Sequence, residues 1–481
     1  MQNFSSDSSS VSKKSSSQKN TFDSGGCYQS VLELIGNTPI VELKSFDTGI
    51  SRLFIKLENQ NPCGSIKDRI GLSMIDNAEK EGKIKPGDTL IEATAGNTGL
   101  GLALIAALKG YNLILVIPDK MSLEKISHLR AMGAEIIMTR SDVEKGHPEY
   151  YQDYALRLSK EIPNSYYINQ FNNPYNPLAH ETTTGPEIWE QMNQKVDAIV
   201  VGVGSAGTIG GLTNFFKKVK PNINFVLADP EGSILKEYFY KSEVGSAGSW
   251  LVEGIGEDFV PIQCDLSLVK AAYSITDKEA FLSARQLLKK EGIFAGSSTG
   301  VLVAAAVKYA KEQKTPQNIV TFACDSGNKY LSKMYNDYWM IDNGFIKKET
   351  KGDLTDIISH SYIKNSVVTI KPNDSLLQVY NKMKLHDISQ IPIIENNNIV
   401  GIIDEYDILL ALEDMDTNAF KKPVMNFMSK NLKTLHPNAN VENLVEILKM
   451  GYTAIITDEK QFYGIITKID YLNYLRLKLE T

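Results

Sequence analysis

The strongest constraint on the fold is an alternation of short apolar runs with helical patterns over residues 27–345. The runs DTLIEA, NLILVIP and DAIVVGV are followed by segments with helical periodicity, which are TGLGLALIAALKG, SLEKISHLRAMG and TIGGLTNFFKKV. Parallel strands buried on both faces form such short runs, and helices connect them. The alternation therefore predicts an α/β fold with open parallel sheets covered by helices, in which ligands bind at the carboxyl ends of strands.

Residues 356–481 contain an internal duplication instead of this alternation. VTIKPNDSLLQVYNKM is similar to KTLHPNANVENLVEIL, and NIVGIIDEYDILLAL is similar to QFYGIITKIDYLNYL, at an offset of about 65 residues. A fixed internal period indicates a duplicated structural unit. We expect two copies, 356–415 and 416–481, each with the order strand, helix, strand, strand, helix, after a polar linker at 346–355.

Composition and charge exclude several functional classes. The net charge of the 481-residue chain is −6, and a nucleic-acid-binding protein needs a clustered basic surface, so we expect no nucleic-acid partner. No run of about 18 apolar residues occurs, which predicts no membrane-spanning segment. The four cysteines are widely spaced without a CxxC pair, so neither a disulfide framework nor a metal site is indicated.

Residues 1–26 are rich in serine and have almost no apolar side chains to bury, which predicts a disordered tail. This tail has no arginine and carries Asp7 and Asp23, unlike an organellar transit peptide, and it lacks the apolar centre of a signal peptide. A cytoplasmic location is therefore expected.

The segment NPCGSIKDR places a lysine at the start of a helix. Pro62 and Gly64 interrupt the preceding strand, Ser65 can cap the helix, and Lys67 follows in its first turn. A helix N-terminus disfavours a positive charge, so the pKa of Lys67 should be lowered. A neutral lysine amine can form a Schiff base with an aldehyde. The alternative interpretation is an exposed lysine paired with Asp68.

Two glycine-rich turns follow predicted strands and open predicted helices. EATAGNTGLG gathers backbone N–H groups with the hydroxyls of Thr94 and Thr98, and GVGSAGTIGG does the same with Gly204, Gly207 and Thr208. Such turns suit a carboxylate or a phosphate, so two turns suggest two anions. GVGSAG is a weak dinucleotide-binding fingerprint because its last glycine comes too early for GxGxxG. Ordinary strand-to-helix connections are the alternative interpretation of each turn.

The segments NPCGSIKDR, EATAGNTG, QFNNPYNPLAHETTTGPEIWE, GVGSAGT and AGSSTG, in this order, resemble the pyridoxal-phosphate β-replacement enzymes. This family contains the O-acetylserine sulfhydrylases and the cystathionine β-synthases. DPEGSIL and LVEGIGEDFVP resemble the cystathionine β-synthase branch, and the duplication resembles the tandem CBS-domain (Bateman) module. The resemblance implies a fold type II catalytic domain of two α/β subdomains over residues 27–345, two CBS domains at 356–415 and 416–481, and a homodimer or larger homo-oligomer.

The resemblance also implies a set of site residues and a cofactor, pyridoxal 5′-phosphate. Lys67 would bind the cofactor covalently and remove the Cα proton of the substrate, and the neutral Ser298 at the pyridine nitrogen would favour β-elimination over transamination. The implied cofactor ligands are Lys67, Asn97, Gly204, Ser205, Ala206, Gly207, Thr208 and Ser298. The implied substrate ligands are Thr94, Ala95, Gly96, Asn97, Thr98 and Gln170.

The implied activity is that of a lyase that forms cystathionine from L-serine or O-acetyl-L-serine and L-homocysteine. This reaction is the first step of transsulfuration to cysteine, and hydrogen sulfide can be released in side reactions. The alternatives are a cysteine synthase that uses sulfide and, outside enzymes, a non-catalytic sensor of an adenosyl ligand. Three departures from the family pattern leave the donor open: Ala95 replaces a usual serine, Phe171 a usual tyrosine and Glu257 a common aromatic residue. Hydroxide is a poor leaving group that needs a proton donor, whereas acetate leaves unaided.

Two histidines bear on cofactors and catalysis. Animal cystathionine β-synthases bind haem through an N-terminal cysteine and histidine, but the first histidine here is His128, so Cys27 has no histidine partner nearby. We therefore expect no haem. His180 is expected to be structural rather than an acid or a base.

In the CBS pair, GIITKID resembles the motif that binds ribose and phosphate, with Thr467 and Asp470 as implied ligands and Gln390 as a third. The ligand would be S-adenosylmethionine or an adenine nucleotide. The first copy has Asp404 in place of the threonine, followed by Asp407, and a carboxylate at the threonine position would repel a phosphate. One adenosyl site is therefore expected rather than two, with assembly alone as the alternative role of the pair.

Overall fold

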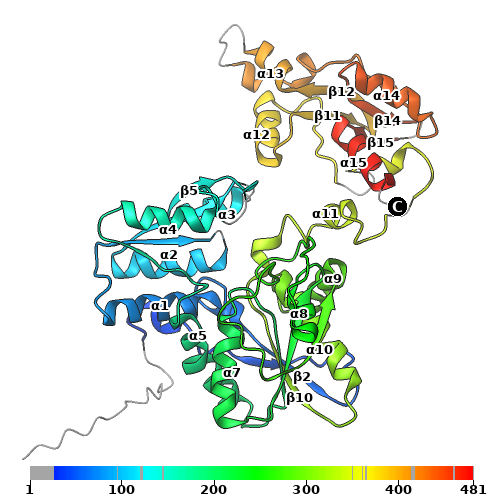
Figure 1. The fold of residues 1–481 in the computed structure, drawn as a ribbon. Helices are drawn as coiled ribbons and strands as arrows, with labels where there is room; N and C mark the ends of the chain where they lie inside the picture. The colour runs from blue at the N-terminus through cyan, green and yellow to red at the C-terminus, as the bar shows by residue number, and fades with distance from the viewer. Residues whose placement is uncertain are drawn as a thin grey trace, which may run out of the picture. The chain divides into compact units, whose positions relative to one another are not determined.

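The computed structural model describes residues 27–94, 96–119, 123–143, 146–348, 350–359, 361–362, 366–412, 418–458 and 461–479. The tail expected over residues 1–26 lies outside the described residues. The chain divides after Tyr330 into two compact units, which we call the N-terminal unit and the C-terminal unit (Figure 1).

The N-terminal unit contains two sheets. The six-stranded sheet has the order β1 (Ile40–Glu42), β2 (Arg52–Lys56), β10 (Asn318–Phe322), β7 (Ala198–Val201), β8 (Asn224–Pro230) and β9 (Val269–Ile275). The four-stranded sheet has the order β5 (Glu135–Thr139), β4 (Asn112–Pro118), β3 (Thr89–Ala93) and β6 (Ser165–Tyr167). All neighbouring pairs are parallel except β1 with β2, which is antiparallel. The predicted parallel α/β architecture is confirmed, with one antiparallel edge strand added.

Helices cover both faces of the four-stranded sheet (Figure 1). The helix α4 (Tyr151–Glu161) lies on one face, and α1 (Lys67–Lys80) and α2 (Asn97–Lys109) lie on the other. Successive side chains of a strand point to opposite faces. Leu90 accordingly packs in the cluster that contains residues of α1 and α2, whereas its neighbour Ile91 packs against residues of α4.

Helix α3 packs against β5 and α2 of the four-stranded sheet, whereas the other helices of the N-terminal unit pack mainly around the six-stranded sheet. The helix α10 contacts β2, β7, β8, β9 and β10. Longer helices end where the sequence supplies caps: a capping box of Thr276 and Glu279 begins α9, and Gly292 in a left-handed conformation ends it. Besides α1, α2 and α4, the N-terminal unit contains α3 (Leu123–Ala131), α5 (Tyr175–Ala179), a π-helix (His180–Thr184), α6 (Gly185–Gln191), α7 (Gly207–Val219), α8 (Leu235–Lys241), α9 (Asp277–Glu291) and α10 (Ser297–Glu312), with 3-10 turns at Val31–Leu34, Glu58–Gln60 and Gly327–Tyr330.

The C-terminal unit shows the predicted duplication. The second copy contains β13 (Thr434–Leu435), α14 (Val441–Lys449), β14 (Ala454–Thr457), β15 (Phe462–Ile466) and α15 (Lys468–Leu479), which is the predicted order of elements. The first copy contains α12 (Leu376–His386), β11 (Gln390–Glu395), β12 (Asn398–Asp404) and α13 (Glu405–Ala411). Its first strand is reduced to a single bridge between Ile370 and Ile393. Before the copies lie α11 (Asp337–Asp342) and a 3-10 turn at Leu354–Asp356.

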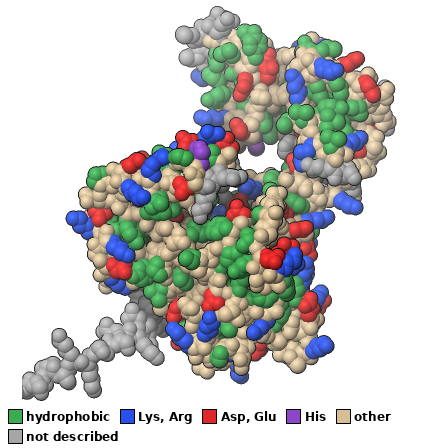
Figure 2. Space-filling view, viewed as in Figure 1, with side chains coloured by type: hydrophobic (Ala, Val, Ile, Leu, Met, Phe, Trp, Pro, Cys, Tyr) green, Lys and Arg blue, Asp and Glu red, His purple; other side chains and the backbone are tan. Residues whose placement is uncertain are grey.

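The described residues also show the surface charge, the helices and the cysteines to which the composition refers. On the face shown in Figure 2, acidic and basic side chains of the described residues are interspersed. Among the described helices, none combines the length and the apolar character needed to cross a membrane. All four cysteines are free, and the described residues contain no group of three or more His, Cys, Asp or Glu side chains placed to hold a metal ion.

Candidate active site

Lys67 is the first residue of α1, as the sequence predicts. Its amide donates a hydrogen bond to Ser65 Oγ (3.2 Å), and its side chain lines a pocket. None of the described residues makes a hydrogen bond or ion pair with its amine. Burial lowers the pKa of Lys67 from its usual value, and nearby acidic groups only partly oppose this. The structure therefore holds an amine that is easily deprotonated at the wall of a pocket.

Asp68 does not pair with this amine. Its carboxylate accepts hydrogen bonds from the Cys63 amide (2.6 Å) and the Ser65 hydroxyl (3.3 Å), and burial raises its pKa to about 6. Asp68 thus closes the turn before α1, and the alternative of an exposed Lys67–Asp68 pair is wrong.

The turn from Gly204 to Thr208 forms an anion cradle at the start of α7. Ala206 adopts φ 63°, and Gly207 is the first helical residue, so the first free N–H groups of the helix are presented at this turn. A Cβ on Gly207 would lie 1.7 Å from Asn176 Oδ1, and a Cβ on Gly204 would lie 2.6 Å from the Gly254 carbonyl oxygen. Only glycine fits at these two positions.

Asn176 fixes the middle of this cradle. Its Nδ2 donates to Ser205 Oγ (3.0 Å) and to the Gln170 carbonyl (2.8 Å), and both Asn176 and Ser205 are buried. Gly204, Ala206, Gly207 and Thr208 line the same pocket as Lys67.

The second cradle follows β3 and opens α2. The Thr98 hydroxyl donates to Gln170 Oε1 (2.8 Å), which leaves the NH₂ group of Gln170 available to a ligand, and the Gly96 amide donates to Thr94 Oγ1 (3.3 Å). The structure thus brings Thr94, Gly96, Thr98 and Gln170 together. Ala95, which the sequence also assigns to this group, lies outside the described residues.

Glu92 holds two segments of this cradle together, a role that was not expected from the sequence. Its buried carboxylate accepts hydrogen bonds from the amides of Ala93 (2.9 Å) and Gln170 (3.1 Å). Burial raises the pKa of Glu92 to about 7. The residue joins the end of β3 to the segment that carries Gln170.

Asn97 is oriented by two further residues that the sequence did not indicate. Its Nδ2 donates to Asp325 Oδ2 (2.8 Å), and its Oδ1 accepts a hydrogen bond from Lys329 Nζ. Lys329 Nζ also donates to the carbonyls of Cys63 (3.2 Å) and Gly64 (3.4 Å). The amide of Asn97 is thus fixed in one orientation at the pocket wall. Asp325 and Lys329 follow β10, far along the chain from Asn97, so only the strand order brings them here.

Ser298 is buried in the first turn of α10 and lines the same pocket. The positive end of the α10 dipole therefore lies beside the Ser298 hydroxyl, and a positive charge there is disfavoured. The ring of Phe171 packs on that of Phe259, with 5.7 Å between ring centroids. Phe171 thus brings no hydroxyl to the site.

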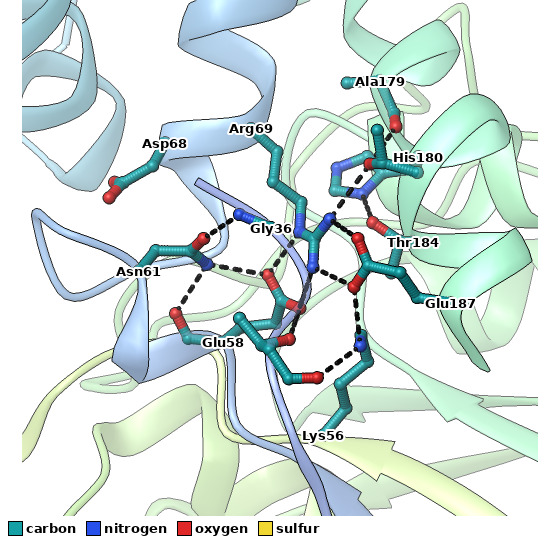
Figure 3. A network of polar contacts seen from close by, with 12 residues as sticks. Gly36, Lys56, Glu58, Asn61, Asp68, Arg69, Ala179, His180, Thr184 and Glu187 are labelled. Carbon is teal, nitrogen blue, oxygen red and sulfur yellow. Dashed lines mark hydrogen bonds and ion pairs between the residues drawn. The ribbon is translucent and has the colours of Figure 1, made fainter. Parts of the chain in front are cut away.

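A buried ion network anchors the start of α1 (Figure 3). Arg69 lies two residues after Lys67, and its guanidinium pairs with Glu58 (2.7 Å) and with Glu187 (2.6 Å). Glu187 also pairs with the fully buried Lys56 (2.8 Å). The network links the end of β2, α1 and α6, so it holds the helix that begins at Lys67 against the rest of the unit.

His180 connects this region with the Gly204–Thr208 cradle. Its Nδ1 is 2.9 Å from Thr184 Oγ1 and its Nε2 is 3.2 Å from Thr208 Oγ1. His180 is fully buried, and burial together with the nearby cations Arg69 and Lys67 lowers its pKa well below the usual value. A neutral ring held by two threonine hydroxyls fits the expected structural role.

These residues fit pyridoxal phosphate. The pocket combines an amine that is easily deprotonated with a phosphate-sized cradle whose glycines exclude any Cβ, and a buried hydroxyl at a helix N-terminus lies at the same pocket. An aldehyde, a phosphate dianion and an unprotonated pyridine nitrogen match these three features. The residues that would hold the cofactor are Lys67, Asn97, Gly204, Ser205, Ala206, Gly207, Thr208 and Ser298.

The residues assigned to an adenosyl ligand lie in the C-terminal unit. Thr467 donates from its amide (2.7 Å) and hydroxyl (2.6 Å) to Asp470 Oδ2, at the start of α15. Gln390 Oε1 accepts a hydrogen bond from the Thr453 hydroxyl (2.8 Å). Thr453 precedes Ala454, which pairs with Ile466 next to Thr467, so the three assigned residues gather at one end of β14 and β15.

Comparisons with known proteins agree with this geometry. The family described as "Pyridoxal-phosphate dependent enzyme" matches residues 31–325, and the CBS domain family matches residues 356–414 and 424–477. Cystathionine beta-synthase of Dictyostelium discoideum is 37% identical over 459 residues, which cover 92% of each chain.

Two further relatives match the N-terminal part. O-acetylserine dependent cystathionine beta-synthase of Bacillus subtilis is 42% identical over 306 residues, which are 63% of this chain and 96% of that protein. The crystal structure of a hydrogen sulfide-producing enzyme from Fusobacterium nucleatum matches with a TM-score of 0.59 and 39% identity, over 63% of this chain and 100% of that one. The chain therefore belongs to the pyridoxal-phosphate-dependent enzymes, in the cystathionine β-synthase branch in which this fold is followed by a CBS-domain pair.

Proposed function

We propose that this enzyme forms cystathionine from L-serine or O-acetyl-L-serine and L-homocysteine by pyridoxal-phosphate-dependent β-replacement, the first step of transsulfuration to cysteine. The observation that carries the proposal is one pocket in which the unpaired Lys67 amine lies with the Gly204–Thr208 cradle and Asn97. The high similarity to cystathionine β-synthases over both units supports it. Release of hydrogen sulfide from cysteine is a side reaction open to the same site.

The residues divide the work of the reaction. Thr94, Gly96, Thr98 and Gln170 bind the substrate carboxylate, and Asn97, fixed by Asp325 and Lys329, aligns it with the pocket. Ala95 belongs to the same proposed group. Bound pyridoxal phosphate supplies a conjugated ring that accepts electron density from Cα. Lys67 takes the Cα proton and later returns it.

Ser298 and α10 explain why β-replacement is favoured. The Ser298 hydroxyl would hold the pyridine nitrogen of bound pyridoxal phosphate without transferring its proton, and the positive end of α10 would disfavour protonation there. Ser298 and α10 would thereby keep the cofactor a weak electron acceptor, which favours loss of the β-substituent over transamination.

A second candidate is a cysteine synthase that uses sulfide in place of homocysteine. The similarity to the hydrogen sulfide-producing enzyme favours a site that handles sulfide, and the similarity to the O-acetylserine dependent relative favours an acetylated donor. Phe171 and Ala95 remove two hydroxyls that the family usually has, which keeps both donors in the proposal.

Product analysis tests the proposal. The purified enzyme would be given serine or O-acetylserine, each with homocysteine or sulfide, and the products would be identified by mass spectrometry. Cystathionine as the product with the highest kcat/KM is expected, and it should disappear in Lys67→Ala. Cysteine as the main product from sulfide would replace the proposal by the cysteine synthase, and a colourless protein without products would favour a non-catalytic sensor.

For the rest of the chain we propose a catalytic domain over 27–345, a linker over 346–355 and CBS domains over 356–415 and 416–481. Gln390, Thr467 and Asp470 are proposed to bind S-adenosylmethionine or an adenine nucleotide. Calorimetric titration with these ligands should show binding that Thr467→Val weakens, and a flat titration of the wild type would refute the site. We further propose a cytoplasmic homodimer or larger homo-oligomer, which sedimentation analysis and fluorescent tagging would test.

A further inference from the structure

Glu257 lies on a loop that packs directly against the Gly204–Thr208 cradle. The Gly256 amide donates to the Val203 carbonyl (2.8 Å), and the Gly254 carbonyl oxygen occupies the place of a Cβ on Gly204. Glu257 Oε1 lies 3.8 Å from the same position. The carboxyl group therefore stands beside the cradle that lines the pocket.

The backbone of Glu257 is fixed on both sides. Its amide donates to Ser233 Oγ (3.1 Å), and its carbonyl accepts from the Ser233 hydroxyl (3.2 Å) and the Ile234 amide (3.1 Å). These hydrogen bonds hold the loop through the backbone of Glu257 and do not use its carboxyl group. The carboxyl group is available to a ligand.

No hydrogen bond or ion pair joins the carboxyl group of Glu257 to any of the described residues. The charged and titratable groups that act on it are Lys67, Asp229, Asp258, Tyr150 and Tyr151. Burial, followed by the neighbouring Asp258, raises the pKa of Glu257 to about 8, and Lys67 alone opposes the rise. The group is therefore a carboxylic acid at neutral pH.

We propose that Glu257 is a catalytic acid and base for the β-substituent, which protonates the hydroxyl of serine as it leaves and accepts the proton of the incoming thiol. This inference rests on the proposed β-replacement and adds to it the group that gives a proton to the leaving oxygen. It assigns serine as a working donor, although Ala95 and Phe171 remove the hydroxyls that would otherwise serve the leaving group.

Protons and bonds balance over the cycle. Lys67 takes the Cα proton, the Cβ–O bond breaks, and the oxygen leaves as water with the proton of Glu257. The thiol then gives its proton to the Glu257 carboxylate as the Cβ–S bond forms, and Lys67 returns its proton to Cα. Both residues end in their starting state, and the net change replaces hydroxyl by thioether with release of water.

The charge of Lys67 determines when Glu257 gives up its proton. A positive charge on Lys67 lowers the pKa of Glu257. Lys67 acquires this charge when it takes the Cα proton, so Glu257 becomes a stronger acid at the moment when the leaving oxygen needs a proton. When the thiol arrives, a carboxylate with a pKa near that of a thiol is a well-matched base.

The test compares donors in Glu257→Gln, which keeps the size of the side chain and removes its proton. General acid catalysis contributes about 10²-fold or more, so kcat/KM for serine with homocysteine should fall by about that factor. The value for O-acetylserine with homocysteine should change little, because acetate leaves without a proton. Glu257→Asp should recover part of the serine activity. Glu231→Gln is the matched control, since Glu231 is an exposed glutamate of the same unit.

A second readout does not depend on turnover. The infrared difference spectrum of the wild type minus Glu257→Gln at neutral pH should show a carboxylic acid C=O stretch, whereas that of the wild type minus Glu231→Gln should not, because the stretch of partly protonated Glu92 cancels in both. Absence of this band from the spectrum of the wild type minus Glu257→Gln would show an ionised Glu257 and overturn the inference.

The kinetic outcomes separate this inference from the proposed function. Selective loss of serine activity in Glu257→Gln supports the inference. Retention of serine activity in that variant, an equal loss with both donors, or a wild type that uses only O-acetylserine overturns it and leaves β-replacement in place. A wild type that forms no product from either donor refutes the proposed function and the inference with it.

Discussion

Replacing Arg69 with methionine is expected to destabilise the N-terminal unit by about 3–5 kcal/mol. The side chains of Arg69 and Glu58 are 2% and 0% exposed, and Glu187 on the other side of the guanidinium is 12% exposed. Methionine keeps much of the volume but leaves these buried carboxylates without their main cation. The loss of α1 anchoring should also weaken cofactor binding at Lys67.

The penalty should depend on pH. Burial raises the pKa of Glu58, but Arg69, together with Lys56 and the Thr38 hydroxyl, outweighs burial, so the pKa lies below its usual 4.5 in the wild type. Ionised Glu58 therefore stabilises the fold at pH values above 4.5, and this stabilisation is lost as the pH falls through the lowered pKa. Without Arg69, burial is the larger effect and the pKa rises above the unfolded value. The variant then loses most stability at neutral pH, and the penalty shrinks as the pH falls toward 4.5.

Differential scanning calorimetry of the full chain would measure the effect on the transition of the N-terminal unit. A fall of about 5–10 °C is expected for Arg69→Met. Arg52→Met is the control, because Arg52 pairs with Glu42 at the surface, where its side chain is 60% exposed and water screens the ion pair. The reasoning would be refuted if both variants melted together or if the penalty were independent of pH.

Three further changes test other parts of the site. Burial raises the pKa of Glu92 to about 7, so the folded state binds this proton more tightly than the unfolded state, and the wild type loses stability as the pH rises from 4.5 to about 7. In urea titrations, Glu92→Gln should flatten the dependence of stability on pH over this range, and an unchanged slope would contradict the raised pKa. Gly207→Ala places a Cβ 1.7 Å from Asn176 Oδ1 and should weaken equilibrium binding of pyridoxal phosphate much more than that of pyridoxal, which has no phosphate to lose. Lys329→Met removes one of the two hydrogen bonds that orient the amide of Asn97 and should raise KM for the donor amino acid more than it lowers kcat in steady-state assays. An unchanged KM would show that Asn97 does not need the hydrogen bond from Lys329.

Much of the fold follows from patterns that are local in the sequence. The runs that became β3, β4 and β7 are short and apolar, and each is followed by a periodic segment that became a helix. The first strand of the first copy was predicted wrongly. In place of a strand, the structure has a single bridge at Ile370.

Some residues of the candidate active site could also be predicted from the sequence, and others could not. Lys67 and the two glycine-rich turns could be found from the sequence, because a helix start and a tight turn are written in neighbouring residues. Glu92, Asp325 and Lys329 were missed, since their types are common on any surface and no local spacing distinguishes them. Their roles depend on burial and on partners far along the chain.

The sequence by itself therefore determined the α/β class, the duplicated C-terminal part, the lysine and the two anion cradles, all of which are encoded within a few successive residues. Only the tertiary structure decided how these parts meet. The strand order β2, β10, β7 brings the loop after β10 beside Lys67 and Asn97, and the packing of the Gly254–Glu257 loop on the cradle places an unpaired carboxyl near Lys67. Strand order and burial arise from the packing of the whole unit, so no short stretch of the chain contains them.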